Sequence, residues 1–473
     1  MLVTANRFKE VAAGALHDPP LQEVLADLRV NAPAARNRAA GGLPEFETLR
    51  DAARTIKLHA IEHLDLYLER FESKVRDSGG QVHWCADGEA ARKVILDICR
   101  AAGARTVTKG KTMVGEEIAI NAHLESHGIT PVETDLGEYI IQLRGEPPSH
   151  IIAPSIHVGK EQVAEIFREK HGGLDPNRPL DDIGDLLAEA RGMLRRRFLA
   201  ADVGITGANF LIAETGSTVI VTNEGNGDLT QTLPRVHIVL AGIEKIVPTL
   251  EDATTIMRVL ARSATGQEMS VYTTFSTGPR RSGDPDGPEH FHVVLLDNGR
   301  SAMLGTEFQD LLRCIRCGAC LDHCPVYHAV GGHAYGSTYS GPIGAELTPA
   351  LVGLEKAANL PNASTLCGRC EAVCPMRIPL PKLLRRWREL EFERHLTPPR
   401  ARWALKLWAF AAGRPALYRL TAVLTARLLY WLGGQHGRIS NLPFAGGWTA
   451  FRDLPAPQGE TFQARWRRQQ RQP

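Results

Sequence analysis

The spacing of apolar and polar residues predicts helices at the start of the chain. Over residues 44–77, apolar side chains recur at steps of three and four positions, which is typical of one long amphipathic helix. Residues 1–40 also have helical character, although three prolines are expected to break it: Pro19, Pro20 and Pro33. The sequence therefore predicts an N-terminal helical region over residues 1–79.

From residue 80 to residue 298, short apolar runs alternate with helical patterns. This alternation predicts an α/β domain with a largely parallel sheet. Helices are expected over 88–102 and 116–127, and strands over 81–86, 105–108, 129–133, 139–143, 150–153, 210–214, 218–222, 236–241 and 292–296. Because some of the later strands are joined by short turns, part of the sheet is expected to be antiparallel or mixed.

Seven of the nine cysteines lie in two short runs. The first run reads Cys314-Ile-Arg-Cys317-Gly-Ala-Cys320-Leu-Asp-His-Cys324-Pro325, a C-x2-C-x2-C-x3-C-P spacing that holds iron–sulfur clusters in bacterial-type ferredoxins. The second reads Cys367-Gly-Arg-Cys370-Glu-Ala-Val-Cys374-Pro375. A structural zinc site usually takes two separated C-x2-C pairs, and disulfides are not expected in a large chain without a signal peptide. The spacing therefore predicts a ferredoxin-like iron–sulfur domain over residues 299–395.

The two runs are expected to exchange ligands, because the last cysteine of each run binds the other cluster in two-cluster ferredoxins. The first cluster is predicted to use Cys314, Cys317, Cys320 and Cys374, and the second Cys324, Cys367 and Cys370. A complete second run would have another cysteine at position 364, where this chain has Ser364. The fourth ligand of the second cluster is thus open between water, Ser364 and a residue of a partner subunit, and a 3Fe–4S form is an alternative to 4Fe–4S.

Two polar motifs of the α/β domain suggest other chemistry. The stretch Lys109-Gly110-Lys111-Thr112 resembles the end of a P-loop, but Arg105 stands where the first glycine is required, so nucleotide binding is not expected. Glu214 and Glu224 lie at opposite ends of an apolar strand, where ligands often bind in α/β proteins. A carboxylate pair and a pair of turn caps explain these two residues equally well.

Other cysteines and histidines have plainer interpretations. Cys85 and Cys99 are expected to be small buried apolar residues. Imidazole ligation is the exception for such clusters, so coordination is the less favoured role for the three nearby histidines: His323, His328 and His333. Residues 331–344 are too glycine-rich for a helix, and we expect an ordered loop that covers the cluster region.

Charge and hydropathy limit the function further. The formal net charge is +2, which argues against a broad nucleic-acid-binding surface. We find no apolar stretch long enough for a transmembrane helix, and free thiols fit a reducing compartment, so a cytoplasmic location is expected.

The C-terminal part, residues 396–473, is expected to hold helices and a tail. Before it, residues 380–392 predict a helix with a basic face of four residues: Lys382, Arg385, Arg386 and Arg388. Gly413 and Pro415 divide residues 401–432 into two helices. A helical hairpin on the cluster domain is favoured, and an interfacial helix at the inner face of the membrane is the alternative. After Gly433 a poorly ordered tail is expected.

At this point the sequence resembles the lactate utilization protein B family, the iron–sulfur subunit of a bacterial three-subunit L-lactate oxidation system. The resemblance covers nearly the whole chain and rests on four stretches: Gly207 to Gly216, Val221 to Asn226, Gly331 to Gly344 and Leu366 to Cys370. The family also has three cysteines in its second run, so Ser364 is not a departure from its pattern.

The resemblance has implications for fold and function. It implies an α/β lactate-utilization domain similar to the sugar-phosphate isomerase and CoA-transferase group, and a domain similar to the helical two-cluster ferredoxins. It also implies two 4Fe–4S clusters, sister subunits with a cysteine-rich domain and a lone lactate-utilization domain, and a respiratory electron acceptor. Electron transfer during oxidation of L-lactate to pyruvate is the function expected. The alternative is an α/β-domain enzyme acting on an acyl or sugar-phosphate substrate, with clusters in a structural or sensing role.

Overall fold

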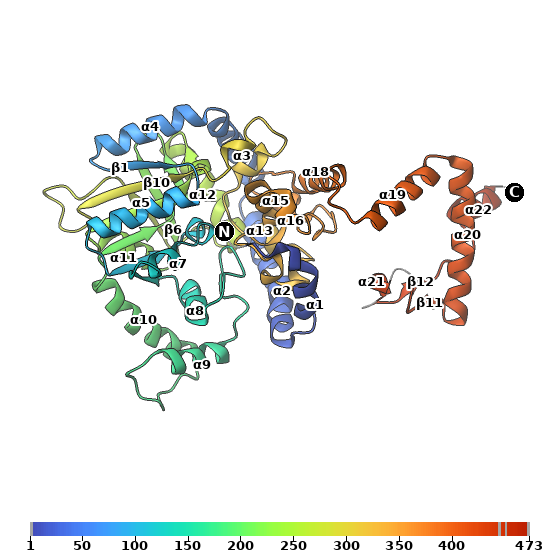
Figure 1. Cartoon of the computed structure of the whole chain (residues 1–473), viewed down its shortest axis with the longest axis horizontal. Helices are drawn as coiled ribbons and strands as arrows, with labels where there is room; N and C mark the ends of the chain where they lie inside the picture. Colours follow the sequence, from blue (N-terminus) through green and yellow to red (C-terminus); the bar gives the residue numbers. More distant parts are fainter. Residues whose placement is uncertain (1–2, 443–445, 450–451, 471–473) are drawn as a thin grey trace. The chain divides into compact units, whose positions relative to one another are not determined.

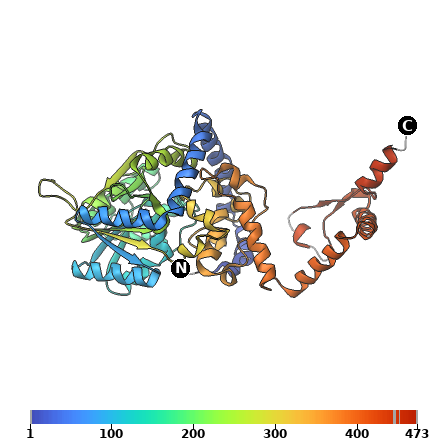
Figure 2. The same cartoon turned by 90° about the horizontal axis from the view of Figure 1, so that it is seen from above.

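The computed structural model describes residues 3–442, 446–449 and 452–470. The chain divides into two units, Met1–Glu391 and Phe392–Pro473 (Figure 1, Figure 2). The first unit contains two sheets and the seven clustered cysteines, and the second is mainly helical. The finer division into four parts, at residues 79, 298 and 395, stays a prediction.

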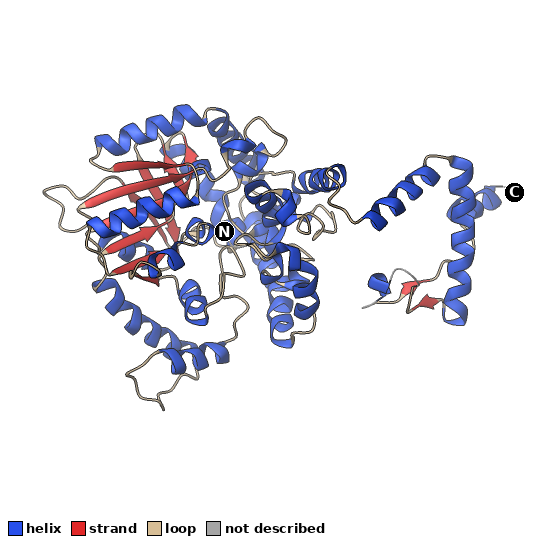
Figure 3. Ribbon diagram, viewed as in Figure 1, coloured by secondary structure: helices blue, strands red, loops and turns tan. Residues whose placement is uncertain are grey.

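The first unit is built around a six-stranded sheet whose neighbouring strands are all parallel, in the order β1-β10-β7-β4-β2-β3 (Figure 3). The strands are β1 Gln81–Cys85, β2 Thr106–Gly110, β3 Thr130–Glu133, β4 Val203–Thr206, β7 Val236–Gly242 and β10 His290–Leu296. This sheet confirms the predicted α/β class. The short strand β4 was not predicted; a Cβ on its Gly204 would lie 1.8 Å from the Thr230 carbonyl oxygen, so close packing requires glycine there.

Successive residues of the central strand β7 face opposite sides of the sheet. Ile238 and Leu240 belong to the core under α5 (Gly88–Ala101), together with Cys85 and Cys99. On the other side, the core joins β7 to two N-terminal helices, α3 (Phe46–Glu62) and α4 (Leu64–Asp77). Helices therefore cover both faces, which explains why the central strands are apolar throughout. The interpretation of Cys85 and Cys99 as buried apolar residues is confirmed.

The N-terminal helices differ from the prediction in two places. The single helix predicted over 44–77 is wrong, because His63, with φ −123° and ψ 40°, separates α3 from α4. The break predicted at Pro33 is also wrong, since Pro33 lies inside α2 (Pro19–Gly41). Pro19 itself opens α2, where its missing N–H has no partner to lose. A shorter helix, α1 (Phe8–Ala15), precedes α2.

Three other predicted elements of the α/β domain are wrong. Residues 139–143 form part of helix α8 (Leu136–Arg144), which begins where Asp135 accepts hydrogen bonds from two N–H groups of the first turn. Residues 150–153 are a loop. The helix predicted over 116–127 is two short ones, because Ala119 takes the left-handed conformation at φ 53°. Those are α6 Met113–Glu117 and α7 Ile120–Glu125.

A second, four-stranded sheet has the order β8-β5-β6-β9. Its strands are β5 Phe210–Ile212, β6 Ser217–Thr222, β8 Ile246–Val247 and β9 Tyr272–Ser276. The β5–β6 and β6–β9 pairs are antiparallel and the β5–β8 pair is parallel, which confirms the expected mixed pairing. The helices between these strands and before them are α9 Lys160–Lys170, α10 Ile183–Leu199, α11 Asn226–Thr232 and α12 Leu250–Ala264.

The cysteine region consists of short helices. They are α13 Ala319–Asp322, α14 Tyr327–Val330, α15 Gly341–Val352, α16 Leu354–Ala357, α17 Arg369–Val373 and α18 Leu380–Glu393. The expectation of a loop over 331–344 is wrong at its end, because α15 begins at Gly341. The helix predicted over 380–392 is confirmed as α18. Of its basic residues, Arg385 pairs with Glu389 and Arg386 with Glu307.

The second unit contains the two helices predicted around Gly413, α19 (Pro399–Ala412) and α20 (Pro415–Gly433). Within the described ranges, no helix is both long and apolar enough to cross a membrane. The expectation of a tail without order is wrong for part of the chain after Gly433. The elements there are β11 Arg438–Ile439, α21 Gly446–Thr449, β12 Leu454–Pro455 and α22 Phe462–Gln470; residues 443–445, 450–451 and 471–473 lie outside the described residues.

Candidate functional site

The two cysteine runs are folded in the same way and lie against each other. Helix α13 follows Gly318 and helix α17 follows Gly368, and the two helices are in contact. Both glycines have positive φ, at 77° and 84°, a conformation that other residues adopt only under strain. A glycine directly after Cys317 in the first run and directly after Cys367 in the second thus turns the chain sharply, so that consecutive thiols can converge.

One group of thiols combines the first run with the end of the second. Burial raises the pKa of Cys320 well above its ordinary value, and the nearby thiols of Cys314, Cys317, Cys370 and Cys374 raise it further. Burial likewise raises the pKa of Cys374, with a contribution from Cys314, which lies 60 positions earlier. These neighbours agree with the predicted set for the first cluster, whose assignment as ligands stays a prediction.

A second group combines the end of the first run with the start of the second. Burial raises the pKa of Cys370 to about 12, and the thiol of Cys324 is the next largest cause. Cys324 in turn has Cys367 as its charged neighbour. These are the three thiols predicted for the second cluster. The two groups adjoin each other, since α13, which carries Cys320, is in contact with α17, which carries Cys370.

The chemistry of these donors fits iron–sulfur clusters. All seven thiols are free, and five are buried, so their thiolates would repel one another strongly unless a cation neutralised them. Backbone N–H groups already point at sulfur: the N–H of Arg316 donates to Cys314 Sγ at 3.4 Å, and that of Ile378 to Cys374 Sγ at 3.5 Å. Hydrogen bonds of this kind tune the potential of a bound cluster.

The corner of the second group is open on one side. Cys367 is exposed, and although burial opposes it, the Arg369 N–H and the Thr365 hydroxyl lower its pKa. The Ser364 hydroxyl accepts a hydrogen bond from the Leu366 N–H at 3.1 Å and so stabilises the turn before Cys367. Ser364 thus lies in the turn before Cys367, as the sequence predicts, but its hydroxyl is hydrogen-bonded within that turn.

A buried carboxyl group that the sequence did not single out lies close to the same corner. Glu346, on α15, is fully buried, and within the described chain neither of its oxygens has a hydrogen-bond partner. Burial raises its pKa well above the ordinary value. It contributes to the raised pKa of Cys370. The only sign of this buried carboxyl group in the sequence is that Glu346 interrupts the apolar stretch of α15.

Arginines from the N-terminal helices hold the second cysteine run in place. Arg36 Nη2 donates to the Val373 carbonyl at 3.0 Å, and Arg50 Nη2 donates to the Cys374 carbonyl at 2.7 Å. Both side chains are buried. More than 320 positions separate the partners, so spacing along the sequence gave no sign of these contacts.

A cavity of about 410 Å³ lies at the carboxyl edge of the parallel sheet. Residues that follow β2, β3, β4 and β7 line it, together with residues of the cysteine region. Ligands of open α/β sheets bind at this edge. The lining residues with polar or charged groups include Lys111, Asp135, Glu138, Asn209, Glu224, Glu244, Lys245, Arg316 and Tyr339, and Cys317 is beside them.

A network of buried charges supports one side of this cavity. Arg300 donates to both oxygens of Glu117, at 2.9 and 2.8 Å, and to Glu244 Oε2 at 2.7 Å. Burial alone would raise the pKa of Glu244, but the neighbouring cations Arg300, Arg316 and Lys245 hold it at about 2. The network therefore fixes Arg316, next to Cys317, relative to the end of β7.

The other motifs of the α/β domain have structural partners. Lys111 pairs with Asp135 and Glu224 on the cavity wall, and no long phosphate-binding helix follows, since α6 spans only Met113–Glu117. The interpretation of Glu214 and Glu224 as a carboxylate pair is wrong. Glu214 accepts a hydrogen bond from the Leu250 N–H at the start of α12, while Glu224 lies beyond the other end of β6.

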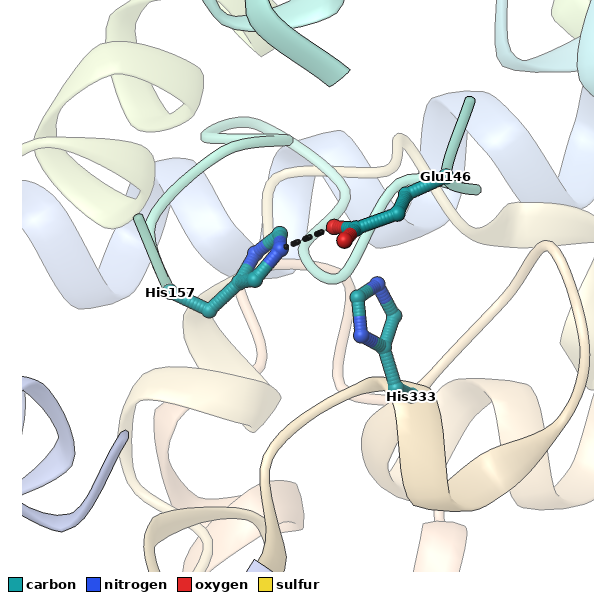
Figure 4. A group of neighbouring side chains, drawn as sticks. All are labelled: Glu146, His157 and His333. Atoms are coloured by element: carbon teal, nitrogen blue, oxygen red, sulfur yellow. Dashed lines mark hydrogen bonds and ion pairs between the residues drawn. The ribbon is translucent and has the colours of Figure 1, made fainter. Parts of the chain in front are cut away.

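His333 lies with a different group of donors. The ligand atoms of Glu146, His157 and His333 are within 4.8 Å of one another (Figure 4). His157 Nε2 is 2.9 Å from Glu146, and His333 Nε2 donates to the Pro147 carbonyl, which leaves its Nδ1 free to bind. Two imidazoles and a carboxylate could hold a divalent transition metal. His323 donates from Nδ1 to the Ala319 carbonyl, which leaves its Nε2 without a partner among the described residues, and the less favoured role of these histidines in cluster coordination stays a prediction.

Three protein families match consecutive parts of this chain. Residues 68–296 match the LUD domain family, residues 310–378 the 4Fe-4S dicluster domain family, and residues 393–471 the C-terminal family of lactate utilisation protein B. Lactate utilization protein B of Bacillus licheniformis is 42% identical over 465 residues, covering 98% of this chain and 96% of the relative. The chain belongs to the lactate utilization protein B family.

Two further relatives are similar to the same degree. The protein of that name from a Geobacillus species is 42% identical over 474 residues, covering 100% of this chain and 99% of the relative. An Escherichia coli protein described as "Uncharacterized electron transport protein YkgF" is 41% identical over 471 residues, with coverage of 98% and 97%. The 4Fe-4S dicluster family match falls on both cysteine runs, and the protein is therefore an iron–sulfur lactate-utilization protein.

Proposed function

We infer that this protein is the electron-transfer subunit of a complex that oxidises L-lactate to pyruvate, and that two 4Fe–4S clusters carry the electrons. The observation that supports this most is the contact between helices α13 and α17, which carry Cys320 of the first group of thiols and Cys370 of the second. Clusters held in adjoining groups exchange electrons readily, whereas a purely structural role needs no second cluster. In this proposal Cys314, Cys317, Cys320 and Cys374 hold the first cluster, and Cys324, Cys367 and Cys370 the second.

The partners of this proposal follow from its chemistry. An iron–sulfur cluster accepts one electron at a time, while oxidation of lactate releases two, so another group must accept them first. We assign that step to the sister subunits, one with a cysteine-rich domain and one with a lone lactate-utilization domain. A respiratory acceptor would then take the electrons, with the complex in the cytoplasm at the inner face of the membrane.

A redox titration tests the proposal. The protein is purified without oxygen and reduced in steps while electron paramagnetic resonance records the clusters. We expect two signals that appear and disappear reversibly, together with iron and sulfide contents that correspond to two clusters. Clusters that no physiological electron donor can reduce reversibly would contradict the proposed electron transfer.

One observation favours a second candidate function. The cavity of about 410 Å³ is large enough for a small-molecule site and is lined by charged side chains. An enzyme acting on an acyl or sugar-phosphate substrate would use it, with the clusters serving structure or sensing. That candidate predicts turnover of such a substrate by a protein whose clusters cannot be reduced reversibly.

A further inference from the structure

The cavity at the carboxyl edge of the sheet has two walls with different charges. On one wall Lys111 is neutralised by Asp135 and Glu224, the second contact being 3.1 Å long. On the other wall lie Lys245, from the turn after β7, and Arg316, from the first cysteine run. The two walls thus join the end of the sheet to the loop that carries Cys314 and Cys317.

The charges around the second wall do not cancel. Two carboxylates lie here, Glu117 and Glu244, and four cationic side chains: Arg300, Arg316, Lys245 and Lys57, whose Nζ donates to the Glu244 carbonyl. Arg300 pairs with both carboxylates, and Arg316 Nη2 reaches Glu244 Oε1 at 3.4 Å. The cationic side chains therefore outnumber the carboxylates here, before any thiolate is counted.

One of these four cations, Lys245, has no partner among the described residues. Its residue is 8% exposed, and in the part of the chain that the structure describes its ammonium group makes no hydrogen bond and no ion pair. Arg316 Nη1 is likewise buried without a partner among the described residues. Buried donors without partners are costly, so both side chains indicate a group that is bound in the working protein.

We propose that this cavity binds a small organic monocarboxylate, a 2-hydroxy or 2-oxo acid, with its carboxylate group on Lys245 and Arg316. A carboxylate supplies negative charge to a wall on which cations outnumber carboxylates, and the unused donors match its oxygens. The side-chain amide of Asn209, on the opposite wall, is available to the oxygen at C2. A three-carbon acid fills only part of the volume, which leaves room for water or a second molecule.

This inference rests on the proposed function for its choice of acid, and it adds a location. The carboxylate would lie against the loop of the first cluster, because Arg316 directly precedes Cys317 and both line the cavity. The protein would then hold the substrate or the product itself, rather than only carry electrons away from a sister subunit. Arg316 and Lys245 would be binding residues.

Another possible role for Lys245 predicts different results for a Lys245 variant. Its charge also lies near the thiol of Cys314, so Lys245 could simply offset the negative charge of the cluster. In that case Lys245→Gln would lower the midpoint potential of one cluster and leave the affinity for carboxylates unchanged. The proposed role requires the affinity to fall.

Isothermal titration calorimetry on the anaerobic full-length protein, loaded with both clusters, is the test. Pyruvate and L-lactate are titrated, with propionate as an acid without oxygen at C2 and lactamide as an uncharged analogue. We expect binding of at least one of the two acids, weaker binding of propionate and none of lactamide. Lys245→Gln should weaken binding at least tenfold, about 1.4 kcal/mol. Lys160→Gln, an exposed lysine on α9, is the control and should bind as the wild type does.

Several outcomes would overturn the proposal. They are no binding by the wild type, equal affinity for propionate, or unchanged affinity in Lys245→Gln. If that variant fails to take up its clusters, the test uses the electron paramagnetic resonance spectrum of the wild-type protein instead. Pyruvate should change the spectrum of one cluster, and lactamide should not. The proposed electron transfer is judged separately, by the reversible reduction of the clusters without any acid. Either conclusion can therefore fail while the other stands.

Discussion

The guanidinium group of Arg50 donates two hydrogen bonds to the carbonyl oxygen of Cys374, from Nη2 at 2.7 Å and from Nε at 3.2 Å. Arg50 lies on α3, a helix that packs on one face of the parallel sheet. Cys374 is the last cysteine of the second run. An N-terminal helix thus fixes the position of a thiol that belongs to the first group. The N-terminal region is part of the cluster site and is not a separate appendage to it.

We expect Arg50→Ala to destabilise the protein and to damage one cluster. Charge-assisted hydrogen bonds are worth about 1.5–3 kcal/mol each, and the variant leaves a buried carbonyl without a partner. Thermal unfolding and cluster content measure the two effects. Arg70→Ala, an exposed arginine on α4, is the control and should change neither. Equal behaviour of the two variants would show that the contact has no role.

Cys314→Ser and Cys374→Ser should remove the same resonance signal, although 60 positions separate the two residues. The reason is that the two thiols lie in one group, as the effect of Cys314 on the pKa of Cys374 indicates. Cys324→Ser should remove the other signal. Loss of different signals in Cys314→Ser and Cys374→Ser would show that the predicted ligand sets are wrong.

The second cluster should be the more sensitive to air. It has three predicted thiols, and one of them, Cys367, is exposed. A corner iron without a thiolate is the most easily lost, so oxidation should give a 3Fe–4S form while the first cluster stays intact. Ser364→Cys should protect the second cluster, as measured by resonance spectra before and after exposure to air. Simultaneous decay of both clusters in the wild type would contradict the open corner.

Arg300→Met should be among the most destabilising substitutions in the chain. The guanidinium group is 1% exposed and pairs with Glu117 and Glu244, which are 0% and 2% exposed. Breaking a buried pair on one side costs about 3–5 kcal/mol, because the carboxylates remain buried without a partner. Chemical denaturation measures the loss. Arg281→Met removes an arginine that is 87% exposed and should change the free energy of unfolding by less than about 0.5 kcal/mol.

The same network predicts a dependence of stability on pH. Although burial opposes it, Arg300 and its neighbours hold the pKa of Glu244 at about 2, below the value of about 4.3 in an unfolded chain. The resulting stability is complete above about pH 5 and is lost as the pH falls toward 2. The wild type should therefore lose more stability than Arg300→Met between about pH 4 and about pH 2, in denaturant titrations at both values. Parallel losses would exclude Glu244 as the cause.

The sequence by itself determined those features that depend on residues close together in the chain. The cysteine spacing indicated the iron–sulfur chemistry, because ligands within one turn are neighbours in any fold. The alternation of apolar runs and helical patterns gave the α/β class, and five of the six strands of the parallel sheet were predicted within two residues. Gly413 and Pro415 correctly placed the boundary between α19 and α20.

The tertiary structure decided what depends on distant partners. Residues 139–143 are apolar enough for a strand or a helix, and the cap at Asp135 and the packing of α8 select the helix. His63 ends α3 so that α3 reaches the cysteine region while α4 follows the sheet. Lys245 is one lysine among many in the sequence; only the fold buries it without a partner beside Arg316, because periodicity encodes which face is buried and not which charges meet there.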